Sequence, residues 1–356
     1  MALHQLRVLG FRNLEDGTLP SFGRINAIVG ANGSGKTSLL EAIHVLARAR
    51  SFRATRLDAV ATHGQDLFRL VADLTSLGSR HRVGLERGRR QFRVRVDGAD
   101  VRVLSELARF LPVQVINTDS QRLLQEGPGL RRQFLNWTTF HVEPGFRECW
   151  RHYERALRQR NAAIRLHDRR LTAAWDQELI ESGESVTEQR QIVIRDLERR
   201  LEPFVAAWLP GIDVEMSYRP GWRRGSSLRG ALLETDERQW QRGFTLAGPH
   251  RADLLFRANS VPAQQWLSRG QQKILVIALI LAVTERLRED AAADPILLVD
   301  DLAAELDGDR RHQVVEALLA TGAQVFMTAT AVGELPAVNE ASWFHVEHGR
   351  LREMLQ

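Results

Sequence analysis

The sequence predicts an α/β fold that is split along the chain by a mainly helical insertion. Residues 1–118 mix strand-like and helical patterns, residues 119–242 carry long helical patterns, and α/β character returns over residues 243–356. No internal repeat and no low-complexity linker separates these regions. The simplest organisation is one head, built from the first and last regions, with residues 119–242 inserted as a helical arm.

A glycine-rich loop near the N-terminus predicts the chemistry of the head. Residues 30–37 fit the pattern Gly-x4-Gly-Lys-Ser/Thr, and a buried strand predicted over residues 24–29 leads into them. A helix follows, and its apolar residues recur on one face: Leu39, Leu40, Ile43, Leu46 and Ala47. This arrangement directs backbone N–H groups and a positive helix end toward a polyphosphate. The candidate residues for binding a nucleoside triphosphate are Gly30, Ala31, Asn32, Gly33, Ser34, Gly35, Lys36 and Thr37.

Lysine usage supports this interpretation. Only two of the 49 basic residues are lysines, and one of them, Lys36, stands inside the loop. A compact ammonium on a flexible stem fits between the β- and γ-phosphate oxygens, whereas the wide planar fork of an arginine does not. We expect Lys36 to neutralise phosphate charge during catalysis and the hydroxyl of Thr37 to bind Mg²⁺.

Two carboxylates follow a second predicted strand. Residues 295–299 are apolar, and Asp300 and Asp301 come directly after them. At the carboxyl edge of a parallel sheet, the first carboxylate can hold Mg²⁺ and the second can polarise an attacking water. We therefore expect Asp300 to bind the metal together with Thr37, and Asp301 to be catalytic. Residues 324–328 predict another buried strand, which ends in a hydroxyl.

A third motif precedes a strongly apolar helix. Leu267-Ser268-Arg269-Gly270-Gln271 comes directly before the apolar run of residues 274–281. Ser268 is a natural N-cap, and Gly270 leaves the backbone open. We expect Ser268, Gly270 and Gln271 to form a second anion-binding helix end. The neighbouring Lys273 is as compatible with an exposed first-turn position as with a phosphate contact.

The stretch after the first predicted helix is rich in strand patterns. The apolar residues Phe92, Val94 and Val96 alternate with Arg93, Arg95 and Asp97, which indicates a strand with one wet face. Asp97-Gly98 predicts a tight hairpin turn. The chain is expected to end in a strand at residues 343–346, a turn at Gly349 and a return through Leu351.

The insertion predicts a surface for a polyanion. Residues 146–171, projected as one helix, place these apolar side chains on one face: Phe146, Trp150, Tyr153, Leu157, Ile164 and Leu171. Arginines fall on a separate face with no acid inside it: Arg147, Arg151, Arg155, Arg158, Arg165 and Arg169. Such a stripe suits the phosphate backbone of DNA and equally a solvated face. The candidate DNA-binding residues are Arg147, Arg151, Arg155 and Arg158, with Arg93 and Arg95 as a second candidate surface.

Bulk properties exclude several classes of protein. The chain has 356 residues, a net charge of +5 and no run of 18 apolar residues, so we expect neither a transmembrane span nor membrane association. Residues 1–7 lack the apolar segment of a signal peptide and predict the first strand instead. Cys149 is the only cysteine, which rules out an internal disulfide and a cysteine-based metal site. We expect a cytoplasmic protein.

Taken in order, these motifs resemble the heads of ATP-binding-cassette ATPases, including the SMC-like branch. Within that superfamily the chain is most similar to the RecF family of bacterial recombination mediators. Three stretches carry this resemblance beyond the generic motifs: residues 11–14, residues 127–163 and residues 248–254. The resemblance spans essentially the whole chain. It implies ATP and Mg²⁺ as cofactors, and an ATP-dependent homodimer that clamps DNA at gaps or damage.

The resemblance also assigns roles and partners. It implies that Lys36, Thr37 and the two aspartates act on the nucleotide in cis, whereas Ser268 and Gly270 reach a γ-phosphate held by the other subunit. Single-stranded, double-stranded or gapped DNA and the RecR and RecO mediator proteins are the implied partners, with roles in recombinase loading and SOS induction. Asp301 stands where transporter ATPases have a glutamate, and Thr328 where they have a histidine, which implies slow hydrolysis that releases the clamp.

Other functions remain in competition with this reading. An ATPase subunit of a membrane transporter would share the head motifs, but would not need an arginine-rich insertion. A chromosome-structural protein would need longer coiled coils than the insertion allows, and a small-molecule kinase would leave Leu267–Gln271 unexplained. Gln114 is a candidate for the glutamine that joins the lobes of such heads, and residues 304–307 are expected to form the loop after the paired aspartates.

Overall fold

The computed structural model describes residues 2–101, 104–289, 295–302, 306, 308–336, 338 and 340–354. The chain forms two compact units, of which the first contains residues 1–120 and 280–356 and the second contains residues 121–279. The boundary between residues 279 and 280 falls inside helix α10 (Arg269–Glu289). Residues 243–279, expected in the head, therefore pack with the insertion, because the strand at residues 253–258 pairs with one at residues 214–219.

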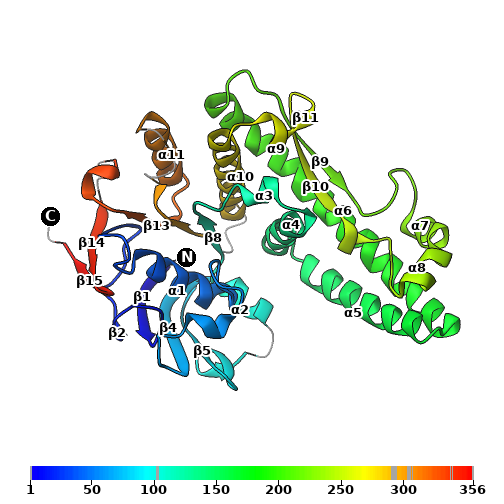
Figure 1. Cartoon of the computed structure of the whole chain (residues 1–356), viewed down its shortest axis with the longest axis horizontal. Helices are drawn as coiled ribbons and strands as arrows, with labels where there is room; N and C mark the ends of the chain where they lie inside the picture. The colour runs from blue at the N-terminus through cyan, green and yellow to red at the C-terminus, as the bar shows by residue number, and fades with distance from the viewer. Residues whose placement is uncertain are drawn as a thin grey trace. The chain divides into compact units, whose positions relative to one another are not determined.

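A largely parallel sheet forms the centre of the first unit (Figure 1). Its strands are β3 (Ile25–Val29), β8 (Val113–Ile116), β12 (Ile296–Val299), β13 (Gln324–Ala329), β14 (Ala341–Glu347) and β15 (Arg350–Glu353), in the order β15-β14-β3-β13-β12-β8. Only β15 runs antiparallel to its neighbour among the described pairs. Strands β3, β12 and β13 are buried along their whole length, as continuous apolar runs predict. Because β13 lies between β3 and β12, the loops that follow these strands meet at one edge.

An antiparallel sheet forms the other layer of the first unit. Its strands are β1 (Ala2–Leu9), β2 (Gly17–Thr18), β4 (Leu67–Ser76), β5 (Ser79–Gly88), β6 (Phe92–Val96) and β7 (Ala99–Asp100), in the order β2-β1-β4-β5-β6-β7. The hairpin turn is confirmed, since Asp97 and Gly98 take φ values of 51° and 83° between β6 and β7. Phe92 was expected on the buried face, but it is 42% exposed and its ring lies beside the guanidinium of Arg87.

Helix α1 (Lys36–Arg48) lies between these two sheets and belongs to one apolar core with both of them. The predicted apolar face is buried in full. The remaining face is buried as well, and it carries the polar residues Glu41 and His44. The first unit also contains helices α2 (Leu104–Phe110) and α11 (Gly308–Ala320) and the last part of α10. A helix covered on both sides has its N-terminus fixed, and that N-terminus follows the glycine-rich loop.

The second unit is mainly helical. Its helices are α3 (Arg122–Gln125), α4 (Pro128–Val142), α5 (Phe146–Arg165), α6 (Arg169–Trp208), α7 (Leu228–Glu234), α8 (Asp236–Arg242), α9 (Ala263–Trp266) and the first part of α10. A small sheet has the order β11-β10-β9, from β9 (Val214–Arg219), β10 (Asp253–Ala258) and β11 (Val261–Pro262). The sequence pattern missed β9, because its alternation is only six residues long and is surrounded by helical patterns.

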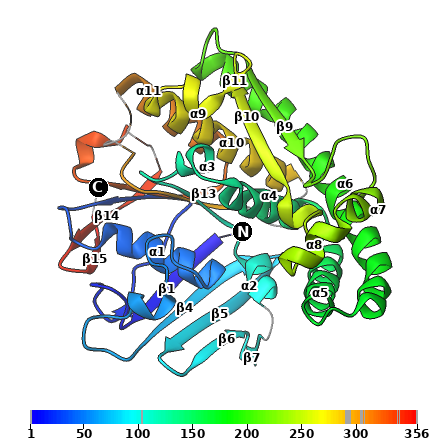
Figure 2. The ribbon, with the colours of Figure 1, turned by 45° about the vertical axis from the view of Figure 1, so that its right-hand side comes forward.

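The expected continuous helix over residues 146–171 is wrong. The chain turns after Arg165, where His167 takes a left-handed φ of 54° and Asp168 caps α6 through the N–H of Leu171. Leu171, expected in the core, is 43% exposed, whereas the other members of that face are buried or half-buried. Figure 2 shows α5 and α6 packed side by side. Helix α6 has 40 residues, a length of about 60 Å.

A histidine in the second unit is held in its neutral form. The hydroxyl of Tyr153 donates to Nδ1 of His250 at 2.6 Å, which leaves the proton on Nε2 to donate to the carbonyl of Thr245 at 3.1 Å. The pKa of His250 is lowered from 6.5 to about 4, mainly by burial. The hydrogen bond to Thr245 acts in the opposite direction, and the charges of nearby arginines add to the lowering. The neutral imidazole therefore joins α5 to the chain segment before β10.

The free energy of unfolding of the second unit should fall as the pH drops from 6.5 toward 4. An unfolded histidine takes up a proton near pH 6.5, whereas folded His250 does so only near pH 4. The contribution of His250 to the free energy of unfolding is therefore fully present above pH 6.5. Between pH 6.5 and 4 it falls by up to about 1.4 kcal/mol for each pH unit. Urea unfolding followed by tryptophan fluorescence measures this loss, because every tryptophan except Trp343 lies in residues 121–279.

His250→Gln is the matched variant for this measurement. It keeps a polar side chain at the position but removes the titrating group, so its free energy of unfolding should depend less on pH than that of the parent between about pH 7 and pH 5. His44, whose pKa is also lowered by burial, lies in the first unit and is common to both proteins. Equal slopes for parent and variant would show that His250 does not stay neutral in the folded unit.

Candidate functional site

The glycine-rich loop follows β3 and turns directly into α1. Gly33 and Gly35 take φ values of 78° and 122°, a backbone region that side chains rarely adopt, so both glycines are required for the turn. Lys36 is buried, and its ammonium donates to the carbonyls of Gly30 at 2.6 Å and Ala31 at 3.1 Å. The loop therefore surrounds a compact cation beside the open N–H groups of the helix start.

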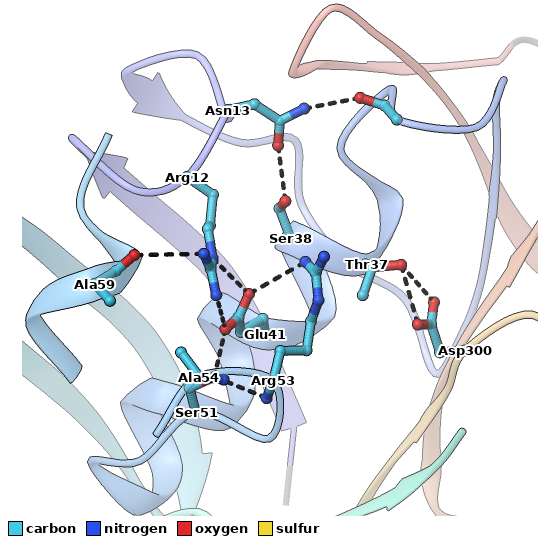
Figure 3. Close-up of polar contacts among 11 residues, drawn as sticks. Arg12, Asn13, Thr37, Ser38, Glu41, Ser51, Arg53, Ala54, Ala59 and Asp300 are labelled. Atoms are coloured by element: carbon cyan, nitrogen blue, oxygen red, sulfur yellow. Dashed lines mark hydrogen bonds and ion pairs between the residues drawn. The ribbon is translucent and has the colours of Figure 1, made fainter. Parts of the chain in front are cut away.

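Neighbouring segments hold the loop in this shape. The side chain of Asn13 donates to the carbonyl of Gly33 at 2.9 Å and accepts from the hydroxyl of Ser38 at 2.7 Å (Figure 3). The N–H of Gly349, in the turn between β14 and β15, donates to the carbonyl of Ser34 at 2.8 Å. The loop is thus fixed from both sides by backbone and side-chain hydrogen bonds before any ligand binds.

A threonine and an aspartate meet at the edge of the parallel sheet. The hydroxyl of Thr37 lies 3.0 Å from both carboxylate oxygens of Asp300 (Figure 3). The hydroxyl of Thr328, from the intervening β13, donates to Asp300 at 2.8 Å and accepts from the N–H of Asp301 at 2.9 Å. Burial raises the pKa of Asp300 above its ordinary value, although the hydrogen bonds from both threonines act in the opposite direction.

These oxygen atoms fit a magnesium ion. Mg²⁺ prefers hard oxygen ligands and is usually held by one or two carboxylates together with substrate phosphates. Thr37 and Asp300 supply a hydroxyl and a carboxylate at hydrogen-bond distance from each other. Among the described residues there is no group of three or more His, Cys, Asp and Glu side chains that could hold a metal alone. The donor set therefore suits a metal that arrives with a phosphate ligand.

Asp301 completes a cavity of about 360 Å³ around the loop. It takes a left-handed φ of 52°, a strained conformation for a residue with a side chain, and lines the cavity together with Asp300, Lys36 and Thr37. The structure thus brings together the loop and both predicted aspartates. Four further lining residues were missed: Arg12, Asn13, Ser38 and Arg53. Arg12 lies in the stretch 11–14 that carried the family resemblance, but its sequence pattern assigned it no role.

The remaining sequence candidates lie elsewhere. Ser268 caps α10 as expected: its Oγ accepts from the N–H of Gln271 at 3.3 Å, and its own N–H donates to Oε1 of Gln271 at 2.9 Å. These residues and Gly270 belong to the second unit, whereas the cavity belongs to the first. Gln114 is buried in the interior of β8 opposite Leu297, before the end of the strand. Of the expected loop at residues 304–307, only residue 306 lies within the described part.

The two candidate DNA surfaces differ in their surroundings. Arg93 and Arg95 lie on the wet face of β6 as predicted, but both bind the carboxylate of Asp100, and the hydrogen bond from Arg93 holds the pKa of Asp100 well below its usual range. On α5, Arg151, Arg155 and Arg158 are exposed, and Arg147 is half-buried. The guanidinium of Arg155 lies over the ring of Trp175 on α6.

Comparison with known proteins places the whole chain in one family. The model of the RecF/RecN/SMC N-terminal domain matches residues 2–349. Curated relatives named DNA replication and repair protein RecF include those of Shewanella piezotolerans and Thioalkalivibrio sulfidiphilus, each 40% identical over 99% of both chains. The chain belongs to the RecF family. The transporter alternative is not favoured by these matches.

Solved structures of the RecF family support the fold. The recombination mediator protein RecF-ATP in the RecFOR pathway matches with a TM-score of 0.88 at 22% identity, over 99% of this chain and 97% of that one. An SMC head bound to the C-terminal winged-helix domain of ScpA matches with a TM-score of 0.60 at 14% identity, over 99% of this chain and 98% of that one. The chain therefore has the SMC-like ATPase fold. None of its described helices is long and apolar enough to cross a membrane.

Asp301→Asn should bind ATP but leave it unhydrolysed. The amide keeps the size of the carboxylate but loses the charge that would orient and polarise a water, a loss of roughly 10²-fold or more in rate. Single-turnover hydrolysis measures the effect. Asp309→Asn, at an exposed position on α11, is the matched control and should hydrolyse ATP normally. Hydrolysis by Asp301→Asn at the parental rate would assign the base to another residue.

Proposed function

We propose that the chain is an ATP-dependent DNA-binding protein of recombinational repair and replication. The observation that carries this proposal is the site at the sheet edge, where the loop, Thr37 and Asp300 meet, in a chain related to RecF over its full length. Lys36 and the loop N–H groups bind the phosphates, and Thr37 and Asp300 hold Mg²⁺. When bound, Mg²⁺ neutralises charge on the phosphates. Asp301 orients the water for slow hydrolysis.

The start of α10 gives ATP a second role in this proposal. A γ-phosphate held by one loop still has unpaired oxygens, and a helix start offers N–H donors and a positive dipole end. Ser268, Gly270 and Gln271 of one subunit would bind the γ-phosphate held by the other, so that ATP joins two heads around DNA at a gap or a damaged site. Hydrolysis then removes the bridge and releases the clamp.

The arginines of α5 are the favoured DNA surface. Arg151, Arg155 and Arg158 are exposed on one helix, whereas Arg93 and Arg95 share the charge of Asp100. Guanidinium groups that are not paired with a carboxylate gain more from phosphate than groups that are. The proposed cellular context, by relationship to RecF of the RecFOR pathway, is recombinase loading with RecO and RecR, together with SOS induction.

DNA affinity should depend on the nucleotide. Fluorescence anisotropy with gapped, single-stranded and double-stranded DNA should show tighter binding with ATP than with ADP or with no nucleotide. Lys36→Ala should lose ATP binding and this dependence, because Lys36 is the cation that the loop itself surrounds, whereas Lys36→Arg should bind ATP and hydrolyse it poorly. Equal DNA affinity of the parent with ATP, with ADP and without nucleotide would refute the proposed dependence on ATP.

Replacing Arg151, Arg155 and Arg158 with alanine should weaken binding to all DNA sequences alike. Each lost phosphate contact should reduce the slope of log affinity against log salt by about 0.9 on duplex DNA. The double variant of Arg93→Ala and Arg95→Ala is the comparison. If the α5 variant keeps the parental slope and the slope of the β6 variant is reduced, the DNA contacts lie on the β6 surface.

Ser268→Arg should separate ATP binding from dimer formation. The variant keeps an intact loop and should bind ATP about as well as the parent, but the bulky cation blocks the helix start. Light scattering should show a monomer when ATP is added, whereas the parent dimerises with ATP and not with ADP. Loss of ATP binding by the variant monomer would mean that Ser268 acts in cis. A parent that stays monomeric with ATP and DNA would contradict the clamp.

A further inference from the structure

A carboxylate with no solvent exposure lies next to the nucleotide cavity. Glu41 is on α1, five residues after Lys36, and its side chain is 0% exposed. It accepts from Nε of Arg12 at 2.9 Å and from Nη2 of Arg12 at 2.8 Å, so the two side chains form a bidentate pair. The hydroxyl of Ser51 also donates to Glu41, and Nη1 of Arg53 donates to it at 3.4 Å (Figure 3).

The burial of Glu41 follows from the fold. Both sheets cover α1, so a polar residue on either face of the helix loses its water. A buried carboxylate is stable only when charged partners and hydrogen bonds replace that water. Arg12 arrives from the segment after β1 and Arg53 from the segment after α1. One carboxylate therefore fixes two arginines from different parts of the chain.

Both arginines also line the nucleotide cavity. Arg12 and Arg53 face it together with Lys36, Thr37 and Asp300. Their side chains are 24% and 47% exposed, in contrast to Glu41. Two guanidinium groups and one carboxylate leave a net charge of +1 in this cluster. Only the guanidinium groups are exposed, so the cluster presents positive charge to the cavity. The charge of Arg53 extends to Asp300, whose pKa it lowers against the larger effect of burial.

We propose that Glu41 is a positioning residue that holds Arg12 and Arg53 at the cavity so that they meet the polyphosphate of the bound nucleotide. It does not touch the nucleotide; it acts through the two arginines. The bidentate pair orients Arg12, and the single bond to Arg53 leaves the rest of that guanidinium for the cavity. This inference rests on the proposed nucleotide site and adds a second group of phosphate-binding cations to Lys36 and the loop.

The proposal is tested by whether Glu41→Gln strengthens or weakens ATP binding. Removal of a negative charge beside an anion site should strengthen ATP binding if Glu41 acts only through its own charge. A glutamine keeps the shape, but its NH₂ group meets guanidinium N–H donors and cannot pair with them. Positioning by Glu41 thus predicts weaker ATP binding although the site becomes more positive. The loss of one charge-assisted pair corresponds to a decrease of roughly tenfold in affinity.

The experiment measures the affinity of the full chain for a fluorescent ATP analogue with Mg²⁺, with circular dichroism and thermal unfolding as checks of folding. Asp73→Asn is the matched control, because it breaks another bidentate pair of the first unit, with Arg82, and changes the net charge equally. Glu41→Gln should bind about tenfold more weakly than the parent, and Asp73→Asn should bind as the parent does. Unchanged or tighter binding by Glu41→Gln overturns the proposal.

Two further variants separate positioning from a general structural role. In an Arg53→Ala background, Glu41→Gln should cost less affinity than in the parent, because one of the arginines that it positions is already gone. An equal cost in both backgrounds overturns the role through Arg53. Arg12→Lys keeps the charge but lacks the bidentate fork, so it should also bind ATP more weakly. Parental affinity in Arg12→Lys overturns the proposal even if Glu41→Gln does not fold.

A parent that binds no ATP would instead refute the nucleotide site itself. In that case Lys36→Ala would equal the parent, and the comparison among Glu41 variants would have no signal. When the parent binds ATP and Lys36→Ala does not, the site stands, and the Glu41 variants test the positioning role alone. The two conclusions can therefore fail separately.

Discussion

The coverage of α1 on both sides is the constraint on which the rest of the first unit depends. One apolar core joins this helix to the parallel sheet and to the antiparallel sheet. A helix held in this way cannot rotate or shift without loss of packing in both layers. Its N-terminus is consequently fixed at the carboxyl edge of the parallel sheet, where the glycine loop ends. The same coverage removes water from Glu41 and so requires the two arginines that bind it.

Strand order then brings the reacting groups together. The loop follows β3, the paired aspartates follow β12, and β13 lies between them. Thr328 at the end of β13 contacts the side chain of Asp300 and the backbone of Asp301. A single hydroxyl therefore links the carboxylate proposed to bind the metal to the residue proposed to orient water. The resemblance to ATP-binding-cassette heads implies a histidine at this position in transporters, whereas the threonine of this chain links the two aspartates without adding a titrating group.

The second unit is organised by buried arginines rather than by apolar contacts alone. Arg160 is 2% exposed and binds Asp176, Gln239 and Thr245, which joins α5, α6 and α8. Arg190 is fully buried and reaches Asn136, Tyr218 and the carbonyl of Pro249. Buried guanidinium groups are stable only with several acceptors in fixed places. The arginine-rich composition thus serves two ends, since some arginines fix the fold and others remain exposed on α5.

The sequence by itself determined the local chemistry: the glycine loop with Lys36 and Thr37, the strand before Asp300 and Asp301, and the serine cap of α10. Each depends on neighbouring residues in the chain, through backbone conformation and hydrophobic periodicity, and these are properties that a sequence pattern records. Tertiary contacts decided three features that the local sequence did not: the turn at residues 166–168, the pairing of β9 with β10, and the partner of Arg93. Only the tertiary structure brought Arg12 and Arg53 to Glu41, because a buried ion pair between distant segments is set by which surfaces the core covers, and no local pattern encodes that.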